Sequence, residues 1–222
     1  MNKTKIDYAD YSWNPVYGCR NGCPYCYARR YCERFGKSFE PHWVQKNFDR
    51  PMPKEPSIIF VNSMSDICWW DGVWIEQVIS QCASNPQHIF LFLTKDPTVY
   101  YNTQFRILEN VWYGFTATNN DEVMNRQVHM YDFDQVWCSA EPLLGAIESL
   151  DDHLVKWLVV GAMTGAGATP VREDWVGAAF QYDGCSIFAK DNMPAWTWEI
   201  YDRSILREYP PEMLRHLGRD ST

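Results

Sequence analysis

The chain has 222 residues, a net charge of −8 and a pI near 5.1, a length that suits one domain. Hydrophobic residues make up 46%, as in ordinary globular proteins, and the acidic excess argues against a protein held on duplex nucleic acid by counterion release. No apolar run reaches the roughly 20 residues of a membrane span, and the first residues lack the apolar core of a signal peptide. We therefore expect a cytoplasmic protein with no membrane partner, folded as a single domain over residues 1–222.

Short apolar runs alternate with helical patterns along most of the chain. The runs that predict strands are 11–14, 57–62, 88–94, 111–116, 135–139, 157–161 and 185–189, and the helical patterns are 71–84, 97–109, 121–131 and 172–182. Continuous apolar strands indicate a parallel sheet covered by helices. About seven strands fall one short of a closed eight-stranded barrel. The sequence therefore predicts an α/β fold, a partial (open) TIM-like (β/α)6-7 barrel, with a doubly wound open sheet as the alternative.

Two segments do not follow the strand–helix pattern. Residues 37–56 contain four prolines and little periodicity, so we expect an irregular excursion there. Residues 192–222 are rich in tryptophan, proline and charge, and we expect a C-terminal extension of the barrel.

Three cysteines stand close together in the run GCRNGCPYCYA, with the spacing C-x3-C-x2-C: Cys19, Cys23 and Cys26. Their thiolates can converge on one inorganic centre. A closed zinc site or an ordinary ferredoxin cluster uses four protein ligands, so three ligands leave a position open for chemistry. The other five cysteines are expected not to be ligands, most of them as small buried hydrophobic side chains: Cys32, Cys68, Cys82, Cys138 and Cys185.

Basic residues surround the cysteine run in the sequence. They are Arg20, Arg29, Arg30, Arg34 and Lys37. Two interpretations fit them: a local basic patch that contacts a ligand, or the solvated face of a helix.

Polar residues follow each predicted strand. In parallel α/β folds ligand sites form at the C-terminal ends of the strands, so these residues would gather at one mouth of the barrel. A helix cap or a solvent-facing loop residue is the alternative for each one alone. The positions that we single out are Asn62, Ser63, Asp66, Lys95, Thr116, Ser139, Glu141 and Lys190.

The cysteine spacing, with Tyr25 before the third cysteine, resembles the signature of the radical S-adenosylmethionine (SAM) superfamily. Six runs together resemble one phage-associated family of radical-SAM-like proteins without a known function. They are SWNPVYGC at 12–19, GCPYCYA at 22–28, FVNSMSD at 60–66, LTK at 93–95, SAEPLLG at 139–145 and VVGAMTGAG at 159–167. The chain departs from that family in two places: the gap between its first two cysteines is shorter, and GAMTG at 161–165 replaces GGESG. It also lacks the GGE run after the second strand that usually contacts the SAM amino group.

The resemblance implies that Cys19, Cys23 and Cys26 hold three irons of a [4Fe–4S] cluster and that SAM chelates the fourth. An external one-electron donor, flavodoxin- or ferredoxin-like, would reduce the cluster. SAM would then be cleaved reductively to methionine and a 5′-deoxyadenosyl radical that abstracts hydrogen from a substrate. We expect SAM contacts from Asn62, Ser63, Asp66, Thr116, Ser139 and Glu141, and catalytic or substrate-binding roles for Lys95, Glu141 and Lys190.

The sequence leaves the substrate open. The phage association favours a nucleotide or nucleic acid, the acidic net charge argues against a long duplex, and a small molecule or a peptide is an alternative. A second hypothesis is a non-enzymatic iron–sulfur or zinc binding module that recognises a partner, with Cys32, His42 or a partner side chain as the fourth ligand. A third is a SAM-independent enzyme in which Lys95 or Glu141 acts as acid or base beside a structural zinc loop.

Overall fold

The structure is a computed structural model that describes residues 1–101 and 105–219. The chain divides into two compact units, Met1–Trp112 and Tyr113–Thr222. None of the described helices is both long enough and apolar enough to cross a membrane. The single domain over residues 1–222 stays a prediction.

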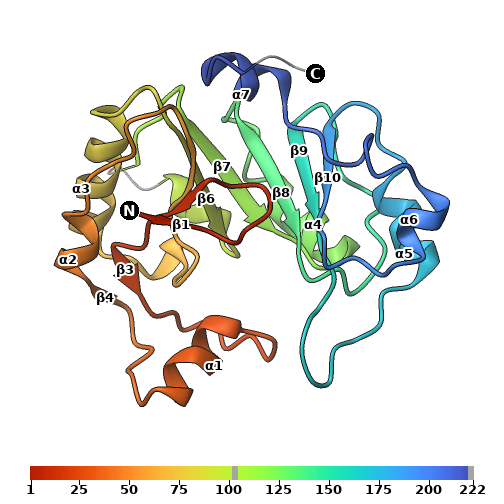
Figure 1. Cartoon of the computed structure of the whole chain (residues 1–222), viewed down its shortest axis with the longest axis horizontal. Coiled ribbons are helices and arrows are strands. Elements are labelled where there is room, and N and C mark those ends of the chain that lie inside the picture. The colour runs from red at the N-terminus through yellow and green to blue at the C-terminus, as the bar shows by residue number, and fades with distance from the viewer. Residues whose placement is uncertain (102–104, 220–222) are drawn as a thin grey trace. The chain divides into compact units, whose positions relative to one another are not determined.

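The first unit is built on short strands, most of them parallel (Figure 1). In the order in which they pair, these strands are β1 (Asn2–Lys3), β2 (Tyr11–Ser12), β5 (Ile58–Phe60) and β6 (Ile89–Thr94). β1 runs antiparallel to β2, whereas β2, β5 and β6 are parallel. The strands β3 (Val16–Tyr17) and β4 (His42–Trp43) form a separate antiparallel pair that frames the cysteine run.

Helices follow the strands of the first unit. They are α1 (Tyr27–Arg34), α2 (Gln45–Phe48), the 3-10 turn η1 (Ile67–Trp69), α3 (Gly72–Ala83) and the 3-10 turn η2 (Pro97–Tyr101). The helix predicted over 97–109 was wrong: η2 is a short turn, residues 105–108 are not helical, and 102–104 lie outside the described residues. Phe105 is instead buried against Phe92 and Tyr100, with ring centroids 5.4 and 5.1 Å away, so tertiary packing outweighs helix propensity.

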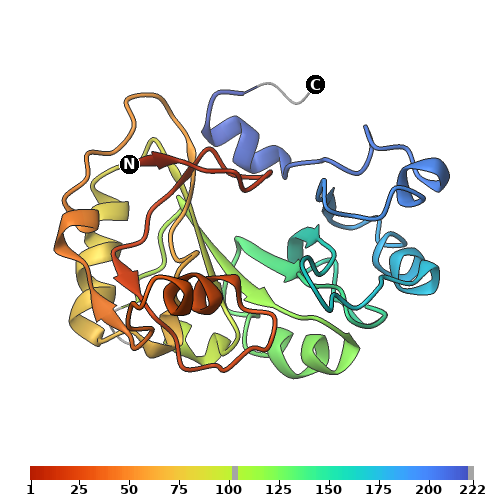
Figure 2. The same ribbon diagram turned by 60° about the horizontal axis from the view of Figure 1, so that its bottom comes forward.

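The predicted irregular excursion over 37–56 contains β4 and α2, and it packs against the residue after β2. The Trp13 indole N–H donates to the Asn47 carbonyl oxygen at 3.1 Å, and its ring stacks on Phe48 with centroids 5.9 Å apart. The excursion therefore fixes the chain just before the cysteine run (Figure 2).

The second unit contains parallel strands only, within its described residues. They are β7 (Val111–Thr116, whose first two residues belong to the first unit), β8 (Val136–Ala140), β9 (Val155–Val160) and β10 (Ser186–Ala189). The helices of this unit are α4 (Asn120–Gln127), α5 (Glu173–Ala179), α6 (Thr197–Ile200) and α7 (Pro211–His216). The predicted C-terminal extension carries α6 and α7, and its residues 220–222 lie outside the described part of the chain.

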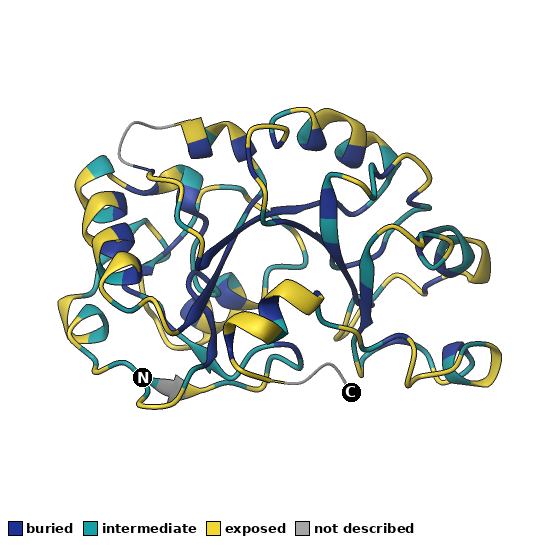
Figure 3. Ribbon diagram, turned by 90° about the horizontal axis from the view of Figure 1, so that it is seen from above, coloured by how far each residue is buried: buried dark blue, intermediate teal, exposed yellow. Residues whose placement is uncertain are grey.

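The burial pattern explains why the strands could be predicted from the sequence. Every residue of β7 and β8 is buried, and most of the helices show one buried and one exposed side (Figure 3). Strands that are covered on both faces consist of continuous apolar residues. In the described residues, seven parallel strands (β2 and β5 to β10) alternate with helices and follow one another in chain order. The predicted α/β class with a partial, open TIM-like barrel is confirmed.

Candidate functional site

The cysteine run begins at Gly18, and only glycine fits at this position. The Gly18 backbone has φ +94°, and a Cβ placed there would lie 2.2 Å from the carbonyl oxygen of Glu40. Gly18 N–H donates to the Met64 carbonyl oxygen at 3.0 Å, and Cys19 N–H donates to that of Phe39 at 3.0 Å. The first cysteine is thus tied both to the excursion and to the segment after β5.

The loop then turns directly into α1. Cys26 is the N-cap of α1, and its thiol accepts a hydrogen bond from Arg29 N–H at 3.4 Å. The Cys19 thiol likewise accepts from Asn21 N–H at 3.4 Å, and the Arg29 guanidinium donates to the Cys19 carbonyl oxygen at 3.1 Å. The Asn21 N–H that points at the Cys19 sulfur favours the thiolate form of that residue, which is the form that binds metal.

Burial works in the opposite direction on two of these thiols. It is the largest cause that raises the pKa of Cys19 to about 12, and it also raises the pKa of Cys23 above its ordinary value, although the ammonium of Lys95 lowers the latter. A bound cationic centre would reverse this effect, because metal binding displaces the thiol proton. The three thiols are half-buried, so the loop is shielded yet open to a ligand.

Three thiols form a donor set that an iron–sulfur cluster can use. No group of three or more His, Cys, Asp or Glu side chains in the described residues is arranged to hold one metal ion. In an iron–sulfur cluster each thiolate binds its own iron, so the three sulfur atoms surround a body of several atoms and need not meet at one point. Of the candidate fourth ligands, Cys32 is only 1% exposed inside α1, and His42 is exposed with its Nδ1 2.7 Å from the Glu40 carbonyl oxygen.

A buried carboxylate ties the cysteine loop to the ends of the strands. Asp66 is 6% exposed. Its Oδ1 accepts from the Thr94 hydroxyl at 2.6 Å and from Cys68 N–H at 3.2 Å. Its Oδ2 accepts from the Asn21 side-chain amide at 2.7 Å and from Lys95 N–H at 3.0 Å. One side chain therefore connects the loop, η1 and the end of β6.

The loop is held at further points by tyrosines and an asparagine. Lys95 Nζ donates to the Tyr25 hydroxyl oxygen at 3.0 Å and lies 5.4 Å from the centroid of that ring. The Tyr27 hydroxyl donates to the Ser63 carbonyl oxygen. Asn14 Nδ2 donates to the Ser63 hydroxyl oxygen at 3.0 Å, and its Oδ1 accepts from Met64 N–H at 2.9 Å. Predicted residues Ser63, Asp66 and Lys95 are thus brought together around the cysteine loop.

Asn62 joins the ends of two neighbouring strands. Its Nδ2 donates to the Leu93 carbonyl oxygen at 2.5 Å, and its Oδ1 accepts from Leu93 N–H at 3.1 Å. The side chain is buried and bridges the end of β5 to β6. The expected contacts of Asn62, Ser63 and Asp66 with SAM stay predictions.

In the second unit, two predicted residues form an ion pair. Lys190 Nζ contacts Glu141 Oε1, with the side chains 14% and 26% exposed. Gly161 lies against the pair: a Cβ there would be 3.0 Å from Lys190 Cδ and 3.2 Å from Glu141 Cδ. Asn192 donates to the Ala162 carbonyl oxygen at 2.8 Å, which holds this strand end. The glycine in the run GAMTG thus leaves room for the ion pair.

Thr116 and Ser139 are register partners on β7 and β8, and both are buried. The Thr116 carbonyl oxygen accepts from Arg126 Nη1 at 2.5 Å, and Arg126 pairs with Glu122 at 2.9 Å. The expected roles of these two residues toward SAM stay predictions, as do catalytic roles for the lysines and Glu141.

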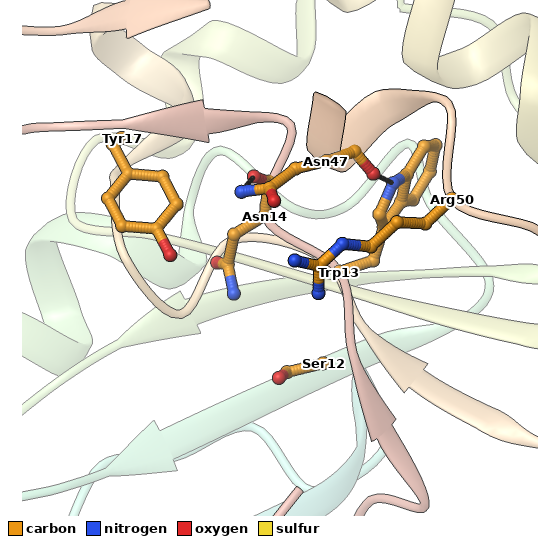
Figure 4. A pocket seen from close by; sticks show the side chains of 6 residues that line it. All are labelled: Ser12, Trp13, Asn14, Tyr17, Asn47 and Arg50. Carbon is orange, nitrogen blue, oxygen red and sulfur yellow. Dashed lines mark hydrogen bonds between the residues drawn. The ribbon is translucent and has the colours of Figure 1, made fainter. Parts of the chain in front are cut away.

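A small polar pocket lies at the end of β2. It is lined by Ser12, Trp13, Asn14, Tyr17, Asn47 and Arg50. The side chains of Tyr17 and Arg50 enter it from opposite sides with Asn14 between them (Figure 4). The Asn14 amide also donates to the Ser63 hydroxyl oxygen, so one lining residue of the pocket also supports the segment beside the cysteine loop.

Sequence reasoning missed several supporting residues. Asn21 and Tyr25 stand inside the cysteine motif, and their position between ligands was the signal that could have identified them. Cys68 was expected to be buried but is half-buried, with its sulfur 3.9 Å from the side-chain oxygen of Asn21. Cys82 and Cys138 are buried as predicted, and Cys185 is half-buried.

Residues 3–187 match a protein family described as "Protein of unknown function (DUF5131)". The chain belongs to this family. No curated protein matches the chain.

Among solved structures, the chain is similar to several of spore photoproduct lyase. A cysteine-to-alanine mutant of that lyase gives a TM-score of 0.54 at 13% identity, over 98% of this chain and 75% of that chain. A mutant with bound AdoMet and dinucleoside spore photoproduct gives 0.49 at 15% identity, over 81% and 62%. The lyase complexed with dinucleoside spore photoproduct gives 0.49 at 16% identity, over 72% and 58%.

The chain spans about half to three quarters of the length of these lyase chains, from 48% to 75%. At 13% identity, the first of these likenesses shows a common fold and nothing finer.

Proposed function

We propose that this protein is a radical SAM enzyme. The observation that carries the proposal is the cysteine loop itself. Three half-buried thiols with the spacing C-x3-C-x2-C stand on one loop that is tied to the ends of parallel strands. The resemblance of the motif to the radical SAM superfamily and the partial-barrel fold both support it.

In this proposal Cys19, Cys23 and Cys26 each hold one iron of a [4Fe–4S] cluster. When bound, the cluster and SAM supply reductive cleavage and a radical, using an electron from an external flavodoxin- or ferredoxin-like donor. The chain supplies position and shielding. Asp66 and Lys95 hold the loop through Asn21 and Tyr25, and this role is added to the SAM and substrate contacts proposed for them.

The second unit offers groups for SAM or the substrate. We propose that Glu141 and Lys190 present one charge of each sign at the ends of β8 and β10, where an ammonium or a carboxylate could exchange into the pair. Thr116, Ser139, Asn62 and Ser63 are the remaining proposed SAM contacts. The proposed substrate is a nucleotide or nucleic acid, and the proposed location is the cytoplasm.

The test is SAM cleavage by protein reconstituted with iron and sulfide without oxygen and then reduced with dithionite. We expect 5′-deoxyadenosine and methionine in equal amounts. Serine variants of Cys19, Cys23 and Cys26 should each abolish the products, whereas Cys82→Ser, which changes a buried cysteine of α3, is the matched control and should retain them. A Cys19→Ser protein that cleaves SAM at the normal rate would contradict the proposal. A wild-type protein that holds only zinc would favour the non-enzymatic binding module.

A further inference from the structure

The helix that follows the cysteine loop carries an exposed surface that combines rings and positive charge. We define the α1 surface as Tyr27, Tyr31, Arg34, Phe35 and Lys37. In Figures 1 and 2, α1 lies at the outside of the strands of the first unit. The sequence allowed two interpretations of this segment, a basic ligand-binding patch or a solvated helix face. The exposure of its aromatic side chains distinguishes between them.

The three rings form a line along one side of the helix. Tyr27, Tyr31 and Phe35 are spaced by four residues, so they lie on the same face. They are 58%, 43% and 56% exposed. The Tyr31 and Phe35 ring centroids are 4.8 Å apart and tilted by 53°. An ordinary solvated face carries polar side chains, so three neighbouring exposed rings need another explanation.

Cations lie against these rings. Lys37 Nζ is 5.2 Å from the centroid of Tyr31, and the Arg34 guanidinium carbon is 5.7 Å from that of Phe35. Neither Arg34 nor Lys37 forms an ion pair with any residue that the structure describes. Each of these two rings is therefore paired with a charge that is available to an anion.

The local charge opposes that of the whole chain. Residues 20–37 contain five basic residues and one acidic residue, a net charge of +4, whereas the chain carries −8. Three of the five have structural partners, because Arg20 pairs with Glu40 at 2.8 Å, Arg29 donates to the Cys19 carbonyl oxygen and Arg30 donates to that of Tyr25. The remaining two cations, Arg34 and Lys37, form a positive area on an otherwise acidic protein.

We propose that the α1 surface binds single-stranded DNA. Bases stack on exposed rings whatever their sequence, and the cations beside the rings track the phosphates. A duplex offers no unstacked bases to such rings, and its stronger field would meet the acidic remainder of the chain. We commit to DNA because base stacking on the rings and phosphate contacts with the cations account for this surface without a contact to a 2′-hydroxyl, which is the group that distinguishes RNA.

The α1 surface lies next to the cysteine loop, so a bound strand could serve as the substrate. Tyr27, the first ring, follows Cys26 directly, and its hydroxyl donates to the Ser63 carbonyl oxygen beside the cysteine loop. A strand that lies along α1 would therefore reach the loop. The inference rests on the proposed function for its substrate role, and it names single-stranded DNA as the class of substrate. The binding itself needs neither the cluster nor SAM.

The first test measures binding of a fluorescein-labelled 15-residue oligo(dT) by fluorescence anisotropy at several salt concentrations. The double variant Y31A/F35A should weaken binding about 25- to 10,000-fold, from stacking losses of roughly five- to 100-fold per ring. Y101A/Y131A is the matched control, since Tyr101 and Tyr131 are 51% and 59% exposed but lie outside 20–37. It should bind as the wild type does.

The second test changes charge. In R34E/K37E the slope of log affinity against log salt should become shallower by about two, one for each lost phosphate contact. The control K46E/K54E changes two exposed lysines of the same unit and should leave the slope nearly unchanged apart from the general effect of net charge. Thermal unfolding of each variant establishes that it is folded.

Three results would overturn the inference. The first is no saturable oligo(dT) binding below about 100 μM at low salt. The second is a loss of oligo(dT) affinity in the control variants Y101A/Y131A and K46E/K54E as large as in the test variants, which would indicate that the α1 surface is not the specific binding site. The third is duplex DNA, oligo(U) or an acidic electron-donor protein bound more than tenfold tighter through the same residues. Cys19→Ser protein should bind oligo(dT) normally. If the wild-type protein bound oligo(dT) but did not cleave SAM, the DNA-binding inference would hold while the proposed function failed. The two proposals can therefore be tested separately.

Discussion

Replacement of Asp66 by asparagine tests how the cysteine loop is held. The substitution preserves shape but converts one carboxylate oxygen into an NH₂ group. Two of the four donors that point at Asp66 then lose their acceptor: either Thr94 and Cys68, or Asn21 and Lys95.

The size of the effect follows from burial. A buried donor left without an acceptor costs about 1–3 kcal/mol. The Thr94 hydroxyl can turn to the Asp96 carbonyl oxygen, 3.3 Å away, which softens one loss. We therefore expect the free energy of unfolding to fall by about 2–4 kcal/mol, and the melting temperature by about 4–16 °C.

The assay has two readouts. The first is the melting temperature of the cluster-free protein, and the second is iron bound per chain after reconstitution, which should fall because Asn21 anchors the loop. Asp71→Asn is the control: Asp71 caps α3 by accepting from Val73 N–H at 2.9 Å, and asparagine caps equally well. If D66N had the same melting temperature as D71N and bound as much iron per chain as the wild type, the argument that Asp66 positions the loop would be refuted.

Three further predictions concern other parts of the fold. Glu141→Gln should lower the unfolding free energy by about 1–3 kcal/mol because it removes the negative charge that faces the mostly buried Lys190 ammonium, and E141Q/K190M should recover part of that loss in urea titrations. Gly18→Ala should block iron binding in reconstituted protein, whereas Gly22→Ala, with nothing within 4 Å of its Cβ, should bind iron. Burial lowers the pKa of His88 below 6.5, so the unfolded chain binds more protons and stability falls as pH drops below about 6.5. His88→Asn should flatten that dependence in melting curves between pH 7 and 5, and an unchanged slope would refute it.

The sheet could be predicted because its strands are covered on both faces. The run 111–116 matches β7 to the residue, and the other predicted strands differ from the structure by a few residues at their ends. The helix over 97–109 could not be excluded from the sequence, because the burial of Phe105 against Phe92 depends on contacts that no local pattern contains.

The site could be predicted only in part, because many of its contacts join residues that are distant in the sequence. The cysteines are close in sequence, so their spacing carries the information. Asn21 and Asp66 are 45 residues apart, and Lys190 and Glu141 are 49 apart. A polar residue after a strand looks the same in sequence whether it binds a ligand, caps a helix or pairs with another side chain.

Electron paramagnetic resonance of the reduced, reconstituted protein, recorded with and without SAM, tests the central claim most directly. We predict a [4Fe–4S]⁺ signal that changes when SAM is added, because three protein thiolates leave one iron for SAM. A signal that SAM does not alter, or a protein that takes up zinc and no iron, would contradict the assignment of Cys19, Cys23 and Cys26 as the ligands of a SAM-binding cluster.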